Sequence, residues 1–185
     1  MSRRLSIKRG DKITVQIVVL IVLLLGAVIM DLRCYKVKNG LIFVGLLLGV
    51  IFRITEGNGK GFLDGIAGCV IPLILLFPLF FLRALGGGDV KLFSVIGLFM
   101  GSRFVLYSIL YSFLVGGILS ILFLIRKGSI FSRYQYLIQY TKSIFIQLNT
   151  DGVKPYYDVK SQGYEGVIHF TVAIFCAVLY QIFIQ

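Results

Sequence analysis

The chain has 185 residues, of which 58% are hydrophobic and only 15% are charged. Soluble domains carry roughly a quarter of charged residues, so the composition excludes an ordinary soluble domain and predicts a chain surrounded mostly by lipid. The formal net charge is +11. The Lys and Arg residues lie between apolar runs, where they would meet anionic headgroups, so membrane lipid is the expected partner and nucleic acid is not.

The apolar runs predict an all-α integral membrane protein. A spanning helix needs about 20 apolar residues, so a chain of this length provides for roughly six spans with short connections. The runs lie at about 13–30, 40–54, 62–84, 90–101, 104–125 and 166–184. We therefore expect a single membrane-embedded domain over residues 1–185, in which the short second and fourth spans cross with the help of snorkelling flanks.

The first apolar run follows Arg3, Arg4, Lys8 and Arg9, as in a secretory signal. It is longer than a typical signal core, and it ends at Asp31 without a small-x-small cleavage pattern. We interpret this run as the first retained span.

The polar stretch 126–163 separates the last two spans. Within it, apolar residues recur at helical spacing opposite polar residues such as Arg133, Gln139 and Lys142. This pattern favours an amphipathic helix in the membrane interface, and the alternative is a soluble hairpin packed on the rest of the protein.

The cysteines and the single histidine argue against several chemistries. Cys34, Cys69 and Cys176 are far apart and form no C-x-x-C pair, so no zinc site, other metal, cofactor or disulfide is expected. His169 has no clear Ser or Cys partner, which argues against a serine or cysteine peptidase. We expect His169 to be a packing or interface residue.

Two aspartates fall at the ends of spans. Asp31 ends the first and Asp89 opens the fourth, so six alternating spans place both on the same side of the membrane. Carboxylates at the edge of the hydrocarbon region are costly and usually functional. Two that lie close together do not both ionise easily, so one stays protonated, which is the arrangement that an aspartyl peptidase needs. Taken singly, each aspartate could instead cap a helix or pair with a base such as Arg33 or Lys91.

The same parity sorts the remaining acids. Asp11, Glu56 and Asp64 fall on the opposite side, and we expect Asp64 to cap the start of the third span. The acids on the Asp31 side that parity does not exclude are Asp151, Asp158 and Glu165, which we interpret as solvated loop charges. Lys and Arg are somewhat more frequent in the loops on the Asp31 side, which favours the cytoplasm for that side, although the basic N-terminal tail argues the other way.

Gly86-Gly87-Gly88 directly precedes Asp89. Residues without Cβ atoms adopt positive φ and allow another chain to approach closely, as an extended peptide substrate must. A plain loop between helices would have the same composition. A phosphate-binding loop fits poorly, because no strand precedes the glycines and an acid follows them.

The segment Gly86-Gly87-Gly88-Asp89-Val90-Lys91-Leu92 resembles the G-x-G-D signature of the type IV prepilin peptidases and archaeal preflagellin peptidases. The segment from Asp31 to Gly40 resembles the family's other characteristic segment, with Val37-Lys38-Asn39 where Ile-Pro-Asn is usual. The missing proline puts the local turn in doubt but not the aspartate. The six spans and the places of both motifs are closest to the short members of the family, such as those of Tad-type pili.

This resemblance implies an aspartic endopeptidase with Asp31 and Asp89 as catalytic residues. Gly86, Gly87, Gly88 and Lys91 would form the loop that the substrate approaches, with Lys91 either close to Asp89 or reaching the headgroups. The substrates would be pilin-like precursors with a short basic leader, cut at the cytoplasmic face of the cell membrane. The family's cysteine-rich N-terminal extension is absent, which implies a peptidase without methyltransferase activity.

The leading alternative is a small transporter or channel in which Asp31 and Asp89 relay protons or bind a cation. Transporters more often place such acids near the bilayer midplane, in broken helices. A non-catalytic membrane assembly subunit is the next alternative. The sequence gives no preference for which aspartate holds the proton, because a coupled pair titrates as a unit.

Overall fold

The computed structural model describes residues 2–57, 59–82, 84–126 and 169–184, and in these ranges it contains six helices and no strand. The helices are α1 (Ser2–Cys34), α2 (Asn39–Thr55), α3 (Gly59–Phe81), α4 (Gly87–Met100), α5 (Ser102–Arg126) and α8 (Phe170–Ile184). The predicted all-α class is confirmed. The predicted interfacial helix in the polar stretch lies outside the described residues.

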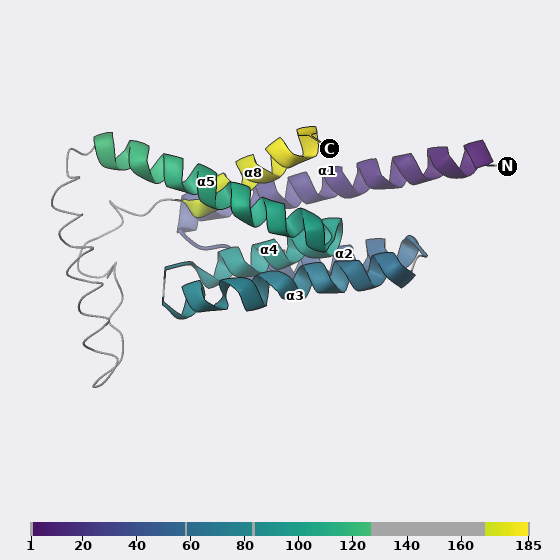
Figure 1. Ribbon diagram of the computed structural model, residues 1–185, viewed down its shortest axis with the longest axis horizontal. Coiled ribbons are helices and arrows are strands. Elements are labelled where there is room, and N and C mark those ends of the chain that lie inside the picture. Colours follow the sequence, from purple (N-terminus) through teal and green to yellow (C-terminus); the bar gives the residue numbers. More distant parts are fainter. Residues whose placement is uncertain (1, 58, 83, 127–168, 185) are drawn as a thin grey trace.

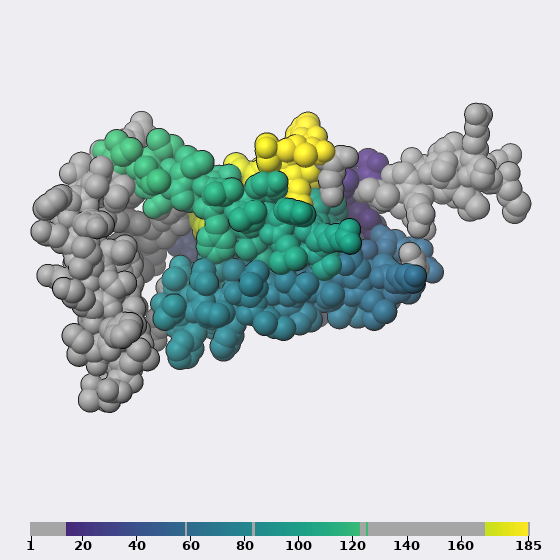
Figure 2. Space-filling model, in the orientation of Figure 1, coloured from purple at the N-terminus to yellow at the C-terminus, as the bar shows by residue number. Residues whose placement is uncertain are grey.

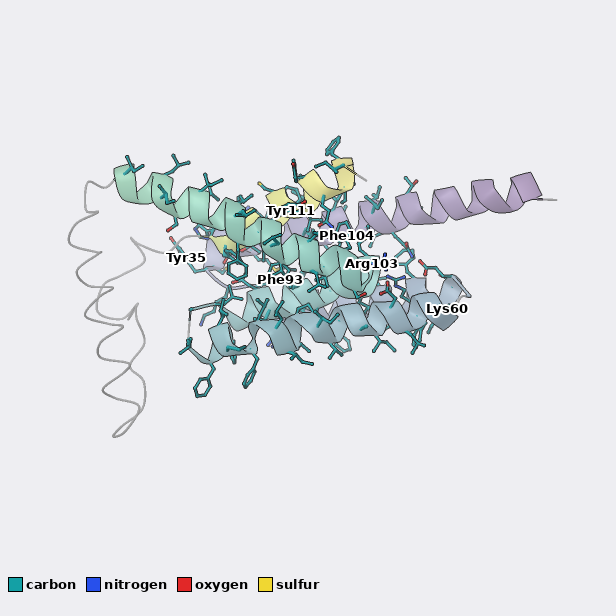
Figure 3. All side chains as sticks on the ribbon, viewed as in Figure 1. Tyr35, Lys60, Phe93, Arg103, Phe104 and Tyr111 are labelled. Carbon is teal, nitrogen blue, oxygen red and sulfur yellow. The ribbon has the colours of Figure 1, made fainter. Side chains whose placement is uncertain are left out.

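The helices run side by side along one long axis, and consecutive helices reverse direction (Figure 1). The bundle therefore has two ends. At the Tyr35 end, α1 ends and α4 and α8 begin; at the Lys60 end, α2 ends and α3 and α5 begin. Figure 3 labels Tyr35 at the first of these ends and Lys60 and Arg103 at the second.

Helix α4 forms the centre of the bundle. Every residue from Leu92 to Phe99 is buried, so α4 has no polar face. A helix that is apolar on all sides is surrounded by other elements, and α2, α3 and α5 all pack against it. This central position fixes the first turn of α4, where Asp89 lies.

Helices α3 and α4 touch backbone to backbone. A Cβ atom on Gly97 would lie 1.9 Å from the carbonyl oxygen of Gly68, and a Cβ on Gly68 would lie 2.4 Å from that of Gly97. Paired glycines allow helix backbones to approach closely where lipid supplies no hydrophobic drive for association. Both positions therefore require glycine.

Three helices contain segments that are long and apolar enough to cross a membrane: Thr14–Cys34, Gly59–Phe81 and Ser102–Leu122. Helices α2 and α8 are shorter but also apolar. Figure 2 shows α3 and α5 covering much of one face of the molecule, and both carry exposed large side chains such as Ile74 and Leu114. A soluble monomer rarely exposes so much contiguous apolar surface, which agrees with a membrane protein.

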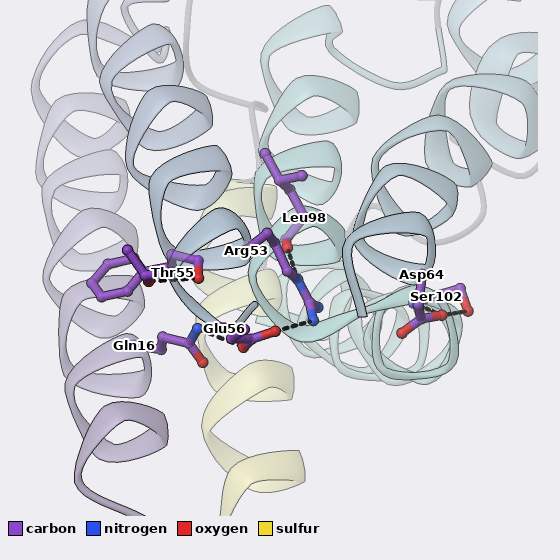
Figure 4. Close-up of polar contacts among 8 residues, drawn as sticks. Gln16, Arg53, Thr55, Glu56, Asp64, Leu98 and Ser102 are labelled. Atoms are coloured by element: carbon purple, nitrogen blue, oxygen red, sulfur yellow. Dashed lines mark hydrogen bonds and ion pairs between the residues drawn. The ribbon is translucent and has the colours of Figure 1, made fainter. Parts of the chain in front are cut away.

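A polar network joins three helices at the Lys60 end (Figure 4). The Arg53 side chain is buried; its Nε donates to the Leu98 carbonyl at 2.8 Å, and Nη1 lies 3.2 Å from Glu56. Gln16 Nε2 donates to the other oxygen of Glu56 at 2.8 Å. The network therefore links α1, the end of α2 and the end of α4 at the end opposite Tyr35.

The prediction that Asp64 caps the third span is wrong. Helix α3 begins at Gly59, so Asp64 lies inside it. Its carboxylate instead accepts a hydrogen bond from the Ser102 backbone N–H at 3.2 Å and one from the Ser102 hydroxyl, at the first residue of α5 (Figure 4). The chain reverses direction at Gly101, whose φ is +96°, and this turn places Ser102 at the start of α5 next to Asp64 of α3.

Candidate functional site

Asp31 and Asp89 lie together at the Tyr35 end. Asp31 is in the last turn of α1 and Asp89 in the first turn of α4. The two carboxylates are close enough for the charge of one to act on the other. The structure therefore brings together the two acids that parity placed on one side, and it holds Glu56 and Asp64 at the other end.

The glycine run shapes the start of α4 around Asp89. The helix begins at Gly87 after the N-cap residue Gly86. The Asp89 N–H donates to the Gly86 carbonyl at 3.1 Å, so the first turn of α4 is closed at this residue. A Cβ on Gly86 would lie only 3.0 Å from Asp89 Oδ2. The N-cap residue of α4 is Gly86 rather than Asp89, and the Asp89 carboxyl group lies in the first turn against a backbone without side chains.

Close approach, rather than unusual backbone geometry, explains these glycines. Among the glycines that the structure describes, positive φ occurs only at Gly57 and Gly101. A Cβ on Gly87 would lie 3.0 Å from the ring of Phe80, and one on Gly88 would lie 3.5 Å from Val37 Cβ. A side chain at Gly87 would therefore press on Phe80 of α3, whereas a Cβ at Gly88 would make only an ordinary contact with Val37 in the connection between α1 and α2.

The connection between α1 and α2 is anchored to α4. Val37 lies against Gly88, and Lys91 Nζ donates to Asn39 Oδ1 at 3.1 Å. Lys91 is exposed, and within the described residues its hydrogen-bond partner is Asn39 rather than Asp89. The segment that follows one aspartate is therefore tied to the helix that carries the other.

Tyr35 ends α1 in a left-handed conformation. Its φ is +53°, and its N–H donates to the Asp31 carbonyl at 2.8 Å. A residue with a side chain in this region costs about 1 to 3 kcal/mol and persists only where its surroundings impose it. The Tyr35 ring stacks on His169, with centroids 5.0 Å apart and planes 27° apart. The strained backbone conformation of Tyr35 therefore coincides with the stacking of its ring on His169.

His169 and Thr171, at the start of α8, both contact Asp31. His169 Nδ1 lies 3.2 Å from Asp31 Oδ2, and the Thr171 hydroxyl donates to the same oxygen. Only 15% of the Asp31 side chain and 23% of the His169 side chain are exposed. His169 was predicted to be a packing or interface residue, and Thr171 was not predicted to have a role. The alternation of the spans was the only signal available, because it places the start of the last span on the same side as Asp31.

An open cavity of about 460 Å³ adjoins the glycine run. Its lining residues are Phe80, Phe81, Ala84, Leu85 and Gly86. They come from the end of α3 and the connection to α4, so the cavity opens beside the turn that carries Asp89. It gives an apolar chain a place to lie next to the glycine backbone.

Comparison with known protein families identifies the class of protein. Residues 18–121 match the type IV leader peptidase family. The match covers more than half of the chain and includes both aspartates and the glycine run, so the chain belongs to this family of membrane peptidases, which processes prepilin-like substrates. Searches of curated proteins and of solved structures gave no significant match.

Proposed function

We propose that this chain is an aspartic endopeptidase in which Asp31 and Asp89 together hydrolyse the bond between the basic leader and the apolar helix of pilin-like precursors. The supporting observation is that the two carboxylates, from different helices, meet at one end of the bundle beside a glycine backbone. The chain would cross the membrane several times, with this end at the cytoplasmic face and lipid around its exposed apolar surface.

Two neighbouring carboxyl groups are sufficient for peptide hydrolysis. The ionised carboxylate takes a proton from a water molecule, and the water oxygen attacks the carbonyl carbon of the scissile peptide. The protonated carboxyl donates its proton to the carbonyl oxygen, which gives a neutral tetrahedral diol. The first carboxyl group then passes the proton that it took from water to the amide nitrogen, the C–N bond breaks, and a hydroxyl proton of the diol returns to the second carboxylate. The products are the carboxyl group of the leader and the new amine of the mature pilin, and both catalytic groups are back in their starting states.

The surroundings of the pair suit a precursor that is partly apolar. An extended backbone can approach Gly86 and Gly87 because no side chain projects from them. The apolar residues that follow the cut can lie in the cavity lined by Phe80 and Leu85, which opens next to Gly86. A helical substrate must unwind locally to reach the carboxylates, so the edge of the bilayer, where water is present, is a suitable place for cleavage.

The proposal is tested by co-expression with a pilin-like precursor. We expect the wild-type protein to shorten the precursor, and Asp31→Asn and Asp89→Asn each to abolish cleavage while inserting in the membrane at normal levels. Asp64→Asn is the matched control because Asp64 lies at the opposite end of the bundle and contacts Ser102. Cleavage by either Asp31→Asn or Asp89→Asn would refute the catalytic pair. Proton or cation flux through wild-type proteoliposomes, with no cleavage of any precursor, would favour a transporter instead.

A further inference from the structure

The two side-chain hydrogen bonds to Asp31 end on one of its two oxygens. His169 Nδ1 and the Thr171 hydroxyl both contact Oδ2. We propose that His169 and Thr171 are positioning residues that hold Oδ2 of Asp31 in place. Oδ1 of Asp31 is then left to accept the proton of the attacking water, so that Asp31 acts as the general base and Asp89 as the general acid. The division of labour rests on the proposed function; the fixing of Oδ2 does not.

The geometry leaves one oxygen available. A carboxylate accepts roughly four hydrogen bonds, two on each oxygen. Two donors occupy Oδ2 of Asp31, and no hydrogen bond to Oδ1 occurs among the residues that the structure describes. Because the side chain is held at one oxygen, its rotation is restricted and the other oxygen has a defined direction. This is what a general base needs in order to meet a water molecule repeatedly in the same place.

Both donors are themselves held in place. Thr171 is 1% exposed, and a β-branched side chain has few allowed χ1 rotamers. The His169 ring is stacked on Tyr35, whose own backbone conformation is fixed at the end of α1. For Nδ1 to donate, its proton must be on that nitrogen, which a carboxylate neighbour favours. The donors thus form a rigid support rather than a chance surface contact.

The surroundings of the two carboxyl groups bear on the division of labour that we propose between them. The titratable groups that act on Asp31 from neighbouring helices are Asp89 at the start of α4 and His169 at the start of α8. Arg33 is exposed on the same helix as Asp31, and Lys91 of α4 is bonded to Asn39. Asp31 lies near the carboxyl end of α1 and Asp89 at the amino end of α4, so the helix dipoles favour a charge on Asp89. On Asp31, Oδ2 accepts two side-chain hydrogen bonds, and bonds to a charged oxygen are generally stronger than the interaction with a helix dipole, so our proposal assigns the charge to Asp31.

The proposal gives α8 a function that its composition does not reveal. The family match ends at residue 121, before this helix begins. Helix α8 packs against α1 and α5, and its first residues reach the Asp31 carboxylate. The last helix would therefore complete a site whose two acids lie on α1 and α4.

The first test measures cleavage across pH in the full-length protein. Thr171→Val removes the hydroxyl and keeps the shape, and we expect kcat to fall roughly tenfold with KM unchanged and the acidic limb of the pH–rate profile to move up by about one unit. Thr171→Ser should restore both. His169→Asn, whose amide nitrogen replaces Nδ1, should retain more activity than His169→Ala. Thr55→Val is the matched control, because that hydroxyl donates to Phe52 at the Lys60 end.

The second test needs no cleavage. Carbon-13 NMR of labelled aspartate in detergent follows each carboxyl directly, with Asp31→Asn and Asp89→Asn assigning the two signals. We expect Asp31 to be the member that becomes charged first as the pH rises, and Thr171→Val to delay it. Charging of Asp89 first, or an unchanged Asp31 signal in Thr171→Val and His169→Ala, would overturn the proposal. Normal NMR behaviour with an inactive wild type would instead refute only the peptidase function.

Discussion

Lys91 in α4 and Asn39 at the start of α2 are joined by a hydrogen bond of 3.1 Å. Lys91 was expected either beside Asp89 or at the headgroups, and the bond to Asn39 gives it a different role. It ties the connection that follows Asp31 to the helix that carries Asp89. Asp31 and Asp89 are therefore connected by this hydrogen bond between their two segments, in addition to lying close together.

The first prediction concerns this bond. Lys91→Met keeps the length of the side chain but removes the donor, so the connection between α1 and α2 should lose one of its anchors. We expect cleavage to fall several-fold while the melting temperature in detergent changes little, since an exposed polar bond contributes only about 0.5 to 1.5 kcal/mol. The readout is the cleavage rate at saturating precursor.

Lys60→Met is the matched control for Lys91→Met, because Lys60 is an exposed lysine at the opposite end. Equal loss of activity in both variants would show that general surface charge matters rather than the bond to Asn39. Asn39→Ala should reproduce the effect of Lys91→Met, and the double variant should be no worse than either alone.

The sequence predicted that Asp31 and Asp89 lie on the same side of the membrane because that inference requires only the number of spans, and the family resemblance implied that they act as a pair. It did not predict the contacts of His169 and Thr171 with Asp31. Those contacts depend on the rotation of α8 about its axis, and a helix that is apolar on all sides has no stripe from which a rotation can be read. The error at Asp64 has a related cause: the helix starts earlier than the apolar run, so a predicted cap became an interior residue.

The second prediction concerns the contact between Gly68 and Gly97. Gly97→Ala would place a Cβ 1.9 Å from the Gly68 carbonyl oxygen, so α3 and α4 must separate. Because every residue of α4 from Leu92 to Phe99 is buried, we expect a loss of about 3 kcal/mol of unfolding free energy, with reduced yield of folded protein. Gly117→Ala is the control: its Cβ would meet nothing within 4 Å, and alanine should stabilise α5 by up to about 1 kcal/mol. Similar thermal unfolding of the two variants would contradict the packing described for α3 and α4.

The third prediction concerns Arg53. Its side chain is 8% exposed and its guanidinium satisfies both the Leu98 carbonyl and Glu56. Arg53→Met fills similar space but leaves these acceptors without their donor, so we expect a loss of about 2 to 4 kcal/mol of unfolding free energy. Glu56→Gln should cost less, because Arg53 keeps its bond to Leu98 and glutamine still offers an oxygen. If Arg53→Met melts at the wild-type temperature, the network at the Lys60 end is not a stabilising one.

The fourth prediction concerns the link between α5 and α8. The buried Ser108 hydroxyl donates to Gln181 Oε1 at 2.8 Å, and Gln181 Nε2 donates to the Phe104 carbonyl at 3.2 Å. Gln181→Leu removes both bonds, and we expect a loss of about 1 to 2 kcal/mol in unfolding free energy, within the range measured for polar contacts between membrane helices. Ser120→Ala on the exposed side of α5 is the control.

The same variants reveal whether the link acts on the site. Since α8 carries Thr171 at one end and Gln181 near the other, a shift of this helix would reach Asp31. We expect the double variant Ser108→Ala with Gln181→Leu to unfold at nearly the same free energy as Gln181→Leu alone, because the hydroxyl no longer has an acceptor to lose. A cleavage rate that falls in Gln181→Leu, in a protein that remains folded at the assay temperature, would show that the placement of α8 controls the carboxylate. An unchanged cleavage rate would show that Gln181 contributes to stability alone and not to the placement of the Asp31 carboxylate.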